Sequence, residues 1–93
     1  MKQTLINGMS LIKSSAYRYK ILKSIEERIK TPAEISRDIE IRLNHVSMFL
    51  KDLRENEMVV CLNADSKKGR LYQITDFGKN VLKRVDKGGG DAK

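Results

Sequence analysis

Ninety-three residues are expected to form one small domain with a modest hydrophobic core, with no room for a separate catalytic or sensor domain. Nineteen lysine and arginine residues stand against 12 aspartate and glutamate residues. The net charge of +7 favours an anionic partner, with nucleic acid ahead of a lipid surface. One cysteine and one histidine exclude an internal disulfide and a zinc site built from four such ligands.

Several functional classes find no support in the sequence. No apolar run approaches the ~20 residues that span a bilayer, and residues 1–10 do not resemble a secretory signal. A nucleophile–base pair, a phosphate-binding glycine loop and a metal-ligand cluster are all missing from the sequence. We therefore expect a cytoplasmic protein that is not an enzyme, binds no cofactor, metal or small-molecule ligand, and does not associate with a membrane.

The first predicted helix runs from Ser10 to about Arg28. Apolar residues recur there at spacings of three and four, the period of an amphipathic helix, and Ser10 is a suitable N-cap. Six basic and two acidic residues between positions 13 and 30 give this segment more than half of the net charge. Residues 1–9 are assigned to an N-terminal extension.

A shorter second helix is predicted from about Pro32 to Glu40. Thr31 is its N-cap, Glu34 completes a capping box three residues later, and Pro32 occupies the first helical position, where a missing N–H costs nothing. The polar side of this helix is acidic. We expect that side to lie away from phosphate groups.

A third helix is predicted at 43–56, after a tight connection. Its apolar stripe has spacings of three, four and three and consists of Leu43, Val46, Leu50 and Leu53. The opposite stripe carries short or hydrogen-bonding side chains, namely Asn44, Ser47, Met48 and Lys51. The helix therefore has one face for a core and one face for a partner.

Beyond residue 56 the apolar period changes to two, which indicates strands. Strands are predicted at 58–62 and 71–75. The turn between them is rich in Asn, Asp, Ser and Gly, and its basic residues are Lys67, Lys68 and Arg70. Cys61, in the first strand, is interpreted as a packing residue.

A last helix begins at Thr75 or Asp76 and is expected to end at Gly88–Gly90. Together these elements predict an α+β domain at 10–86, which consists of a three-helix core, a two-stranded β-hairpin and a C-terminal helix. A disordered tail is predicted at 87–93.

Four segments of the chain resemble one known family. Pro32–Ser36 followed by Leu43–Leu53 resembles the helix-turn-helix of small MarR- and ArsR-like winged-helix regulators, especially the compact archaeal type. Met58-Val59 resembles the start of their wing, and Lys68–Gly78 resembles its end, with the closing Thr-Asp-Phe-Gly as the most specific part. The similarity covers about Tyr17 to Leu82. The predicted fold is therefore a winged helix-turn-helix.

The resemblance implies a transcriptional regulator that binds double-stranded DNA sequence-selectively. Helix 43–56 would enter the major groove, and the basic wing, 63–71, would lie on the backbone or in the minor groove. The residue types agree with this role, because base edges are read by short hydrogen-bonding or apolar side chains. The candidate DNA-binding residues are Arg42, Asn44, His45, Ser47, Met48, Lys51, Lys67, Lys68 and Arg70.

Individual roles follow from side-chain chemistry. Asn44 can pair bidentately with adenine, Met48 can lie on a thymine methyl group, and Lys51 can reach guanine or the backbone. Arg70 suits a narrow minor groove. Arg42 is a poor N-cap but can contact a phosphate.

The third helix is net neutral, so we expect affinity to come largely from the wing and the first helix. A homodimer is expected as well, because one winged helix reads only a few base pairs. Its interface is predicted in the N-terminal segment and first helix, with a contribution from the C-terminal helix.

Two other functions remain open. In the first, the chain is a winged-helix protein–protein interaction module of the transcription machinery, and the stripe of Asn44, Ser47 and Met48 meets protein. In the second, it binds RNA, although the aromatic content of 5% offers little base stacking.

Overall fold

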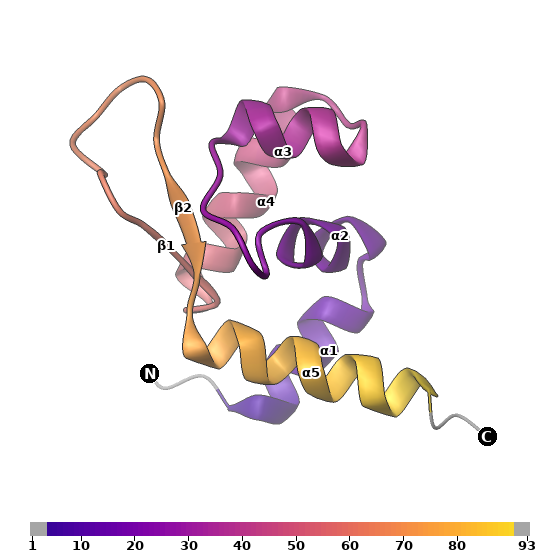
Figure 1. The fold of residues 1–93 in the computed structure, drawn as a ribbon. Coiled ribbons are helices and arrows are strands. Elements are labelled where there is room, and N and C mark those ends of the chain that lie inside the picture. Colours follow the sequence, from indigo (N-terminus) through magenta and orange to yellow (C-terminus); the bar gives the residue numbers. More distant parts are fainter. Residues whose placement is uncertain (1–3, 91–93) are drawn as a thin grey trace.

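A computed structural model describes residues 4–90, and it contains five helices and one two-stranded antiparallel hairpin in that range. The elements in chain order are α1 (Leu5–Lys13), α2 (Ala16–Ser24), α3 (Pro32–Ile39), α4 (Leu43–Glu55), β1 (Val59–Cys61), β2 (Tyr72–Ile74) and α5 (Asp76–Gly90). Figure 1 shows α1 and α5 side by side at one end, α3 and α4 at the other, and α2 between them, with the hairpin projecting to one side. This is the predicted winged helix-turn-helix.

The predicted first helix is wrong as a single element, because the chain breaks between α1 and α2. The Ser15 side chain accepts a hydrogen bond from the backbone N–H of Arg18 at 3.4 Å and so caps α2. The Thr4 side chain caps α1 in the same way. Serine hydroxyls compete with helical backbone bonding, and here they favour a corner over a continuous helix. Helix α1 therefore begins within residues 1–9, and α2 ends at Ser24.

The second and third predicted helices are confirmed. The capping box of α3 is complete, with the Thr31 backbone N–H donating to the Glu34 carboxylate at 2.8 Å. Glu40 ends α3 in a left-handed conformation, with φ of 58°, which turns the chain towards α4. One detail of the predicted stripe is wrong. Leu43 is 50% exposed because it lies at the first position of α4, beyond the reach of the core.

The hairpin forms where it was expected, with shorter strands. Val59 pairs with Ile74 and Cys61 pairs with Tyr72. Tyr72 also forms an isolated bridge with Lys30, which ties the chain segment before α3 to the base of the hairpin. Val60 is exposed, because only alternate residues of a strand face the core.

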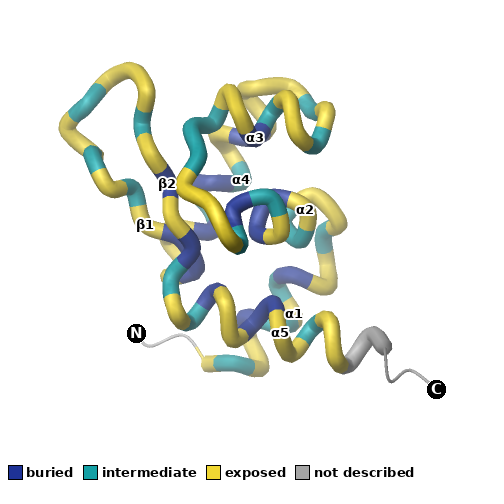
Figure 2. The backbone as a smooth tube through the Cα atoms, in the orientation of Figure 1, coloured by how far each residue is buried: buried dark blue, intermediate teal, exposed yellow. Residues whose placement is uncertain are grey.

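One core holds these elements together. Its largest buried side chains come from every helix and from β1. Figure 2 shows buried positions along the helices and at the base of the hairpin, whereas the wing loop is exposed or half-buried. Helix α5 ends at Gly90, within the glycine run at which we expected it to end, and so includes residues 87–90 of the predicted tail. Residues 91–93 of the predicted tail lie outside the described residues. None of the helices in the described range is long and apolar enough to cross a membrane.

The junction between the hairpin and α5 explains the Thr-Asp-Phe-Gly motif. The Thr75 backbone N–H donates to the Met58 carbonyl at 2.9 Å, and the Thr75 hydroxyl donates to the Glu57 carbonyl at 2.7 Å. The Gly78 N–H donates in turn to the Thr75 hydroxyl at 2.9 Å. A Cβ on Gly78 would lie 2.3 Å from the Met58 carbonyl oxygen, so this close approach requires glycine.

Replacing Gly78 with alanine tests that contact. Helix propensity alone predicts a gain of about 1 kcal/mol for Gly78→Ala. The clash with backbone predicts a net loss of about 1–3 kcal/mol in the free energy of unfolding, measured by urea denaturation. Asn80→Ala, at an exposed position of α5, is the matched control and should change stability little. A stabilised Gly78→Ala variant would contradict the close approach.

Polar contacts fix α5 onto α2. The Tyr19 hydroxyl donates to Asp86 at 2.6 Å, and Lys23 Nζ lies 3.1 Å from the same carboxylate. The hydrogen bond from Tyr19, with that from Lys23, lowers the pKa of Asp86 below its ordinary value. The same hydrogen bond raises the pKa of Tyr19.

The lowered pKa of Asp86 makes this contact pH-dependent. A depressed carboxyl pKa contributes stability that is present above the unfolded-state pKa, near 3.9, and is lost as the pH falls through the folded-state value. We expect Tyr19→Phe to lose about 1 kcal/mol of unfolding free energy at pH 7 and less at pH 3. Tyr17→Phe is the control. Thermal unfolding at both pH values checks this, and an equal loss at pH 7 and pH 3 would refute it.

Candidate nucleic-acid interface

The buried stripe of α4 determines which side chains of that helix face solvent. Val46, Leu50 and Leu53 are fully buried against the other helices. The predicted contact residues of α4 therefore point outward, and all are exposed, namely Asn44, His45, Ser47, Met48 and Lys51. Arg42 precedes them as an N-cap without a side-chain capping bond, and its side chain is exposed too. The predicted partner face of α4 is thus accessible.

The wing loop is held in one shape by Asn63. Its side-chain oxygen accepts from the Leu71 N–H at 2.7 Å, and its amide nitrogen donates to the Gly69 carbonyl at 3.2 Å. Gly69 has a φ of 65°, a conformation that glycine adopts without strain. Sequence reasoning missed this role of Asn63, although asparagine in a turn signals such side-chain bonding to the backbone.

The three basic residues of the wing differ in their surroundings. Lys67 and Lys68 are exposed. Arg70 is half-buried, and its Nε donates to the Ser66 carbonyl at 2.7 Å. Arg70 therefore braces the loop with one N–H and keeps its terminal nitrogens for a further contact.

A groove of about 740 Å³ runs between α4 and the wing. Its lining includes five cationic side chains: Lys51 and Arg54 from α4, and Lys67, Lys68 and Arg70 from the wing. Ser47, Leu43 and the start of α3 line it as well, and no carboxylate is among the described lining residues. The structure thus brings together two groups of predicted residues and adds Arg54. Arg54 was not among the candidate DNA-binding residues predicted from the sequence.

The other predicted residues lie outside the lining of this groove. Arg42, Asn44 and His45 occupy the first turn of α4 and its N-cap. Met48, which is 56% exposed, borders a separate shallow hollow together with Lys51 and Asp52. The exposed face of α4 therefore continues past the groove on the side away from the wing.

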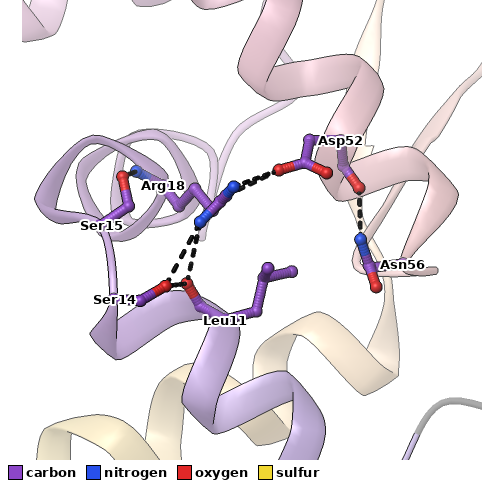
Figure 3. A network of polar contacts seen from close by, with 6 residues as sticks. All are labelled: Leu11, Ser14, Ser15, Arg18, Asp52 and Asn56. Carbon is purple, nitrogen blue, oxygen red and sulfur yellow. Dashed lines mark hydrogen bonds and ion pairs between the residues drawn. The ribbon is translucent and has the colours of Figure 1, made fainter.

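Tertiary contacts change the electrostatics expected from the neutral sequence of α4. Asp52 turns towards α2 and pairs with Arg18 at 2.6 Å (Figure 3). On α3, the Asp38 carboxylate pairs with Lys30, which lowers the pKa of Asp38. Asp52 is thus engaged by a cation of α2 and Asp38 by a cation of the segment before α3, and the described lining of the groove keeps its positive charge. The first of these pairs occupies Arg18, a cation of the first predicted helix, which we had expected to supply affinity.

Comparisons with known proteins agree with this geometry. Residues 17–88 match the family model described as winged helix-turn-helix. A search of curated protein sequences returns no match. Among solved structures, a cysteine-to-serine mutant of MarR from E. coli has a TM-score of 0.77 at 25% identity, with 94% of this chain and 65% of that chain covered.

Two further structures are similar. The MarR mutant complexed with operator DNA has a TM-score of 0.72 at 25% identity, covering 89% of this chain and 61% of that chain. A double mutant of ZitR from Lactococcus lactis has a TM-score of 0.71 at 23% identity, covering 82% and 53%. The chain thus spans between about half and two thirds of the length of these proteins. The family model covers most of the chain and the fold agrees with it, so this chain belongs to the winged helix-turn-helix family.

Proposed function

We propose that the protein is a transcriptional regulator that binds double-stranded DNA sequence-selectively. The observation that carries this proposal is the groove between α4 and the wing, with five cations and no carboxylate among its described lining residues. Polyanion binding needs such a concentration of unopposed positive charge. The similarity to MarR, a mutant of which was solved with operator DNA, supports the same proposal.

In the proposed complex, α4 enters the major groove and the wing follows the neighbouring backbone. Asn44 and Met48 face base edges, where an amide pairs with adenine and a thioether packs on a thymine methyl group. Ser47 and His45 contact bases or phosphates near them. Lys51 reaches guanine or the backbone.

The remaining contacts are to phosphates and give affinity without sequence information. Arg42 at the start of α4 and Arg54 at its last turn flank the reading face. Lys67 and Lys68 extend from the wing, and Arg70 reaches the backbone or minor groove with its terminal nitrogens. The braced loop lowers the entropy cost of placing these charges.

Two variants distinguish recognition of bases from contact with phosphates. Lys67→Ala/Lys68→Ala should weaken binding to every duplex and reduce the slope of log affinity against log salt by about 2. Asn44→Ala should cost about 1–3 kcal/mol on the preferred site and little on other sequences. The site comes from selection in a random duplex library, and fluorescence anisotropy at several salt concentrations measures the binding.

The control for net charge is Lys79→Ala/Lys83→Ala, which removes two exposed cations from α5. An equal loss in this control would mean that charge alone, and not the groove, drives binding. An unchanged site preference in Asn44→Ala would exclude its role in base reading. Absence of duplex binding at low salt would favour the protein-interaction function instead.

We also propose that the regulator is a homodimer, with α1 as the principal pairing surface and α5 contributing. The two helices pack on each other, and Gly8 is buried between them, where a Cβ would lie 2.7 Å from Val81. Ile6 on α1 is nevertheless 78% exposed. A second copy of the chain would cover this apolar side chain and give the two reading helices a two-fold arrangement.

Substitution of Ile6 tests the dimer. The wild-type protein should sediment with twice the chain mass in analytical ultracentrifugation, and Ile6→Glu should shift it to the monomer, because a carboxylate would be buried in the interface. Asn7→Glu, the next residue and also exposed, is the control that adds the same charge. A monomeric wild-type protein, or a dimer unaffected by Ile6→Glu, would overturn the proposed interface.

A further inference from the structure

Arg18 lies where three helices meet (Figure 3). Its Nη2 lies 2.6 Å from the Asp52 carboxylate on α4, and its Nε donates to the same oxygen at 2.8 Å. Its Nη1 donates to the Leu11 carbonyl at 3.3 Å and the Ser14 hydroxyl at 3.4 Å, both at the end of α1. The guanidinium therefore joins α1 and α2 to α4.

These contacts fix the position of the guanidinium more firmly than an ordinary surface ion pair would. The Leu11 carbonyl belongs to the last turn of α1, where carbonyls lack helical partners and attract cations. The planar group also lies 5.8 Å from the centre of the Phe49 ring. The Arg18 and Asp52 side chains are 21% and 33% exposed, so solvent screens their attraction only in part.

Asp52 lies beside residues that are proposed to contact DNA. It follows Lys51 directly and shares a shallow hollow with Met48 and Lys51, both of which are proposed DNA contacts. A free carboxylate at this place would repel the phosphate backbone of a bound duplex. The pairing turns it towards α2, as Figure 3 shows.

We propose that Arg18 is a positioning residue for DNA recognition, which holds the Asp52 carboxylate away from the duplex and neutralises it. Arg18 lines the same hollow as Asp52 and acts on DNA binding through that carboxylate. This inference rests on the proposed DNA-binding function. Sequence composition does not reveal it, because the two residues are 34 positions apart and belong to different helices.

A double-mutant cycle on duplex affinity tests the proposal in the 93-residue chain. Arg18→Gln should weaken binding about three- to tenfold at ~0.1 M salt, because it releases the Asp52 charge. Asp52→Asn should bind at least as tightly as wild type. The double variant Arg18→Gln/Asp52→Asn should recover to within about twofold of Asp52→Asn. Simple charge addition would instead leave it as far below Asp52→Asn as Arg18→Gln lies below wild type.

Two controls separate this role from others. Lys20→Gln removes one exposed cation from α2 and should change affinity less than twofold. Glu55→Gln removes the other acid of the same hollow, and its effect should be additive with Arg18→Gln. Melting temperatures of all variants report folding separately.

The outcomes are distinguishable. Recovery of affinity in the double variant, without recovery of its melting temperature, supports the positioning role. A loss in Arg18→Gln that Asp52→Asn does not relieve would overturn it and leave Arg18 a structural residue. If the wild-type protein itself binds no duplex, the proposed function fails first, and this inference fails with it.

Discussion

The interface depends on how α4 is anchored in the core. Val46, Leu50 and Leu53 recur at spacings of four and three and are buried, which leaves this helix one possible orientation. A rotation of α4 would expose this apolar stripe at a cost of several kcal/mol. The outward face of α4 is therefore a consequence of core packing. The residues proposed to read DNA occupy this face and are exposed.

The proposed binding of DNA also requires a local excess of positive charge, and tertiary contacts contribute to it. The chain carries 12 acidic residues, and α3 and α4 include several of them, although none is among the described residues that line the groove. Asp52 is neutralised by Arg18, Asp38 by Lys30, and Glu34 is held in the capping box. Although the net charge is modest, five cations without a carboxylate therefore line one groove in the described part of the chain. Charge sorting of this kind gives a small protein a polyanion-binding surface without an extreme overall composition.

Local signals in the sequence were sufficient for several elements. The capping box predicted the start of α3, because its geometry involves only four consecutive residues. The spacing of apolar residues predicted α4 and the hairpin, because a helical or strand period is also a property of a short stretch of chain. The break between α1 and α2 at Ser14 and Ser15 was not predicted. The apolar pattern continues through this serine pair, and the break depends also on the packing of α1 against α5, which is a tertiary contact.

The sequence named candidate residues for the proposed site but not how the fold arranges them. Exposure of Asn44 and Ser47 followed from the stripe opposite to them. That Lys51 and the wing lysines face one groove follows from the angle between α4 and the hairpin, which no sequence window contains. The pairing of Arg18 with Asp52 and the bracing of the wing by Asn63 arise from contacts that form only after folding.

The most direct measurement is a map of the protein surface that a duplex covers. In an NMR titration with the selected DNA, backbone amide shifts should change along α4 and in the wing at 63–71, with the exposed face of α5 unaffected. The account predicts that both regions respond together at one stoichiometry, because they line one groove. Shifts confined to α1 and α5, with α4 and the wing unchanged, would contradict it.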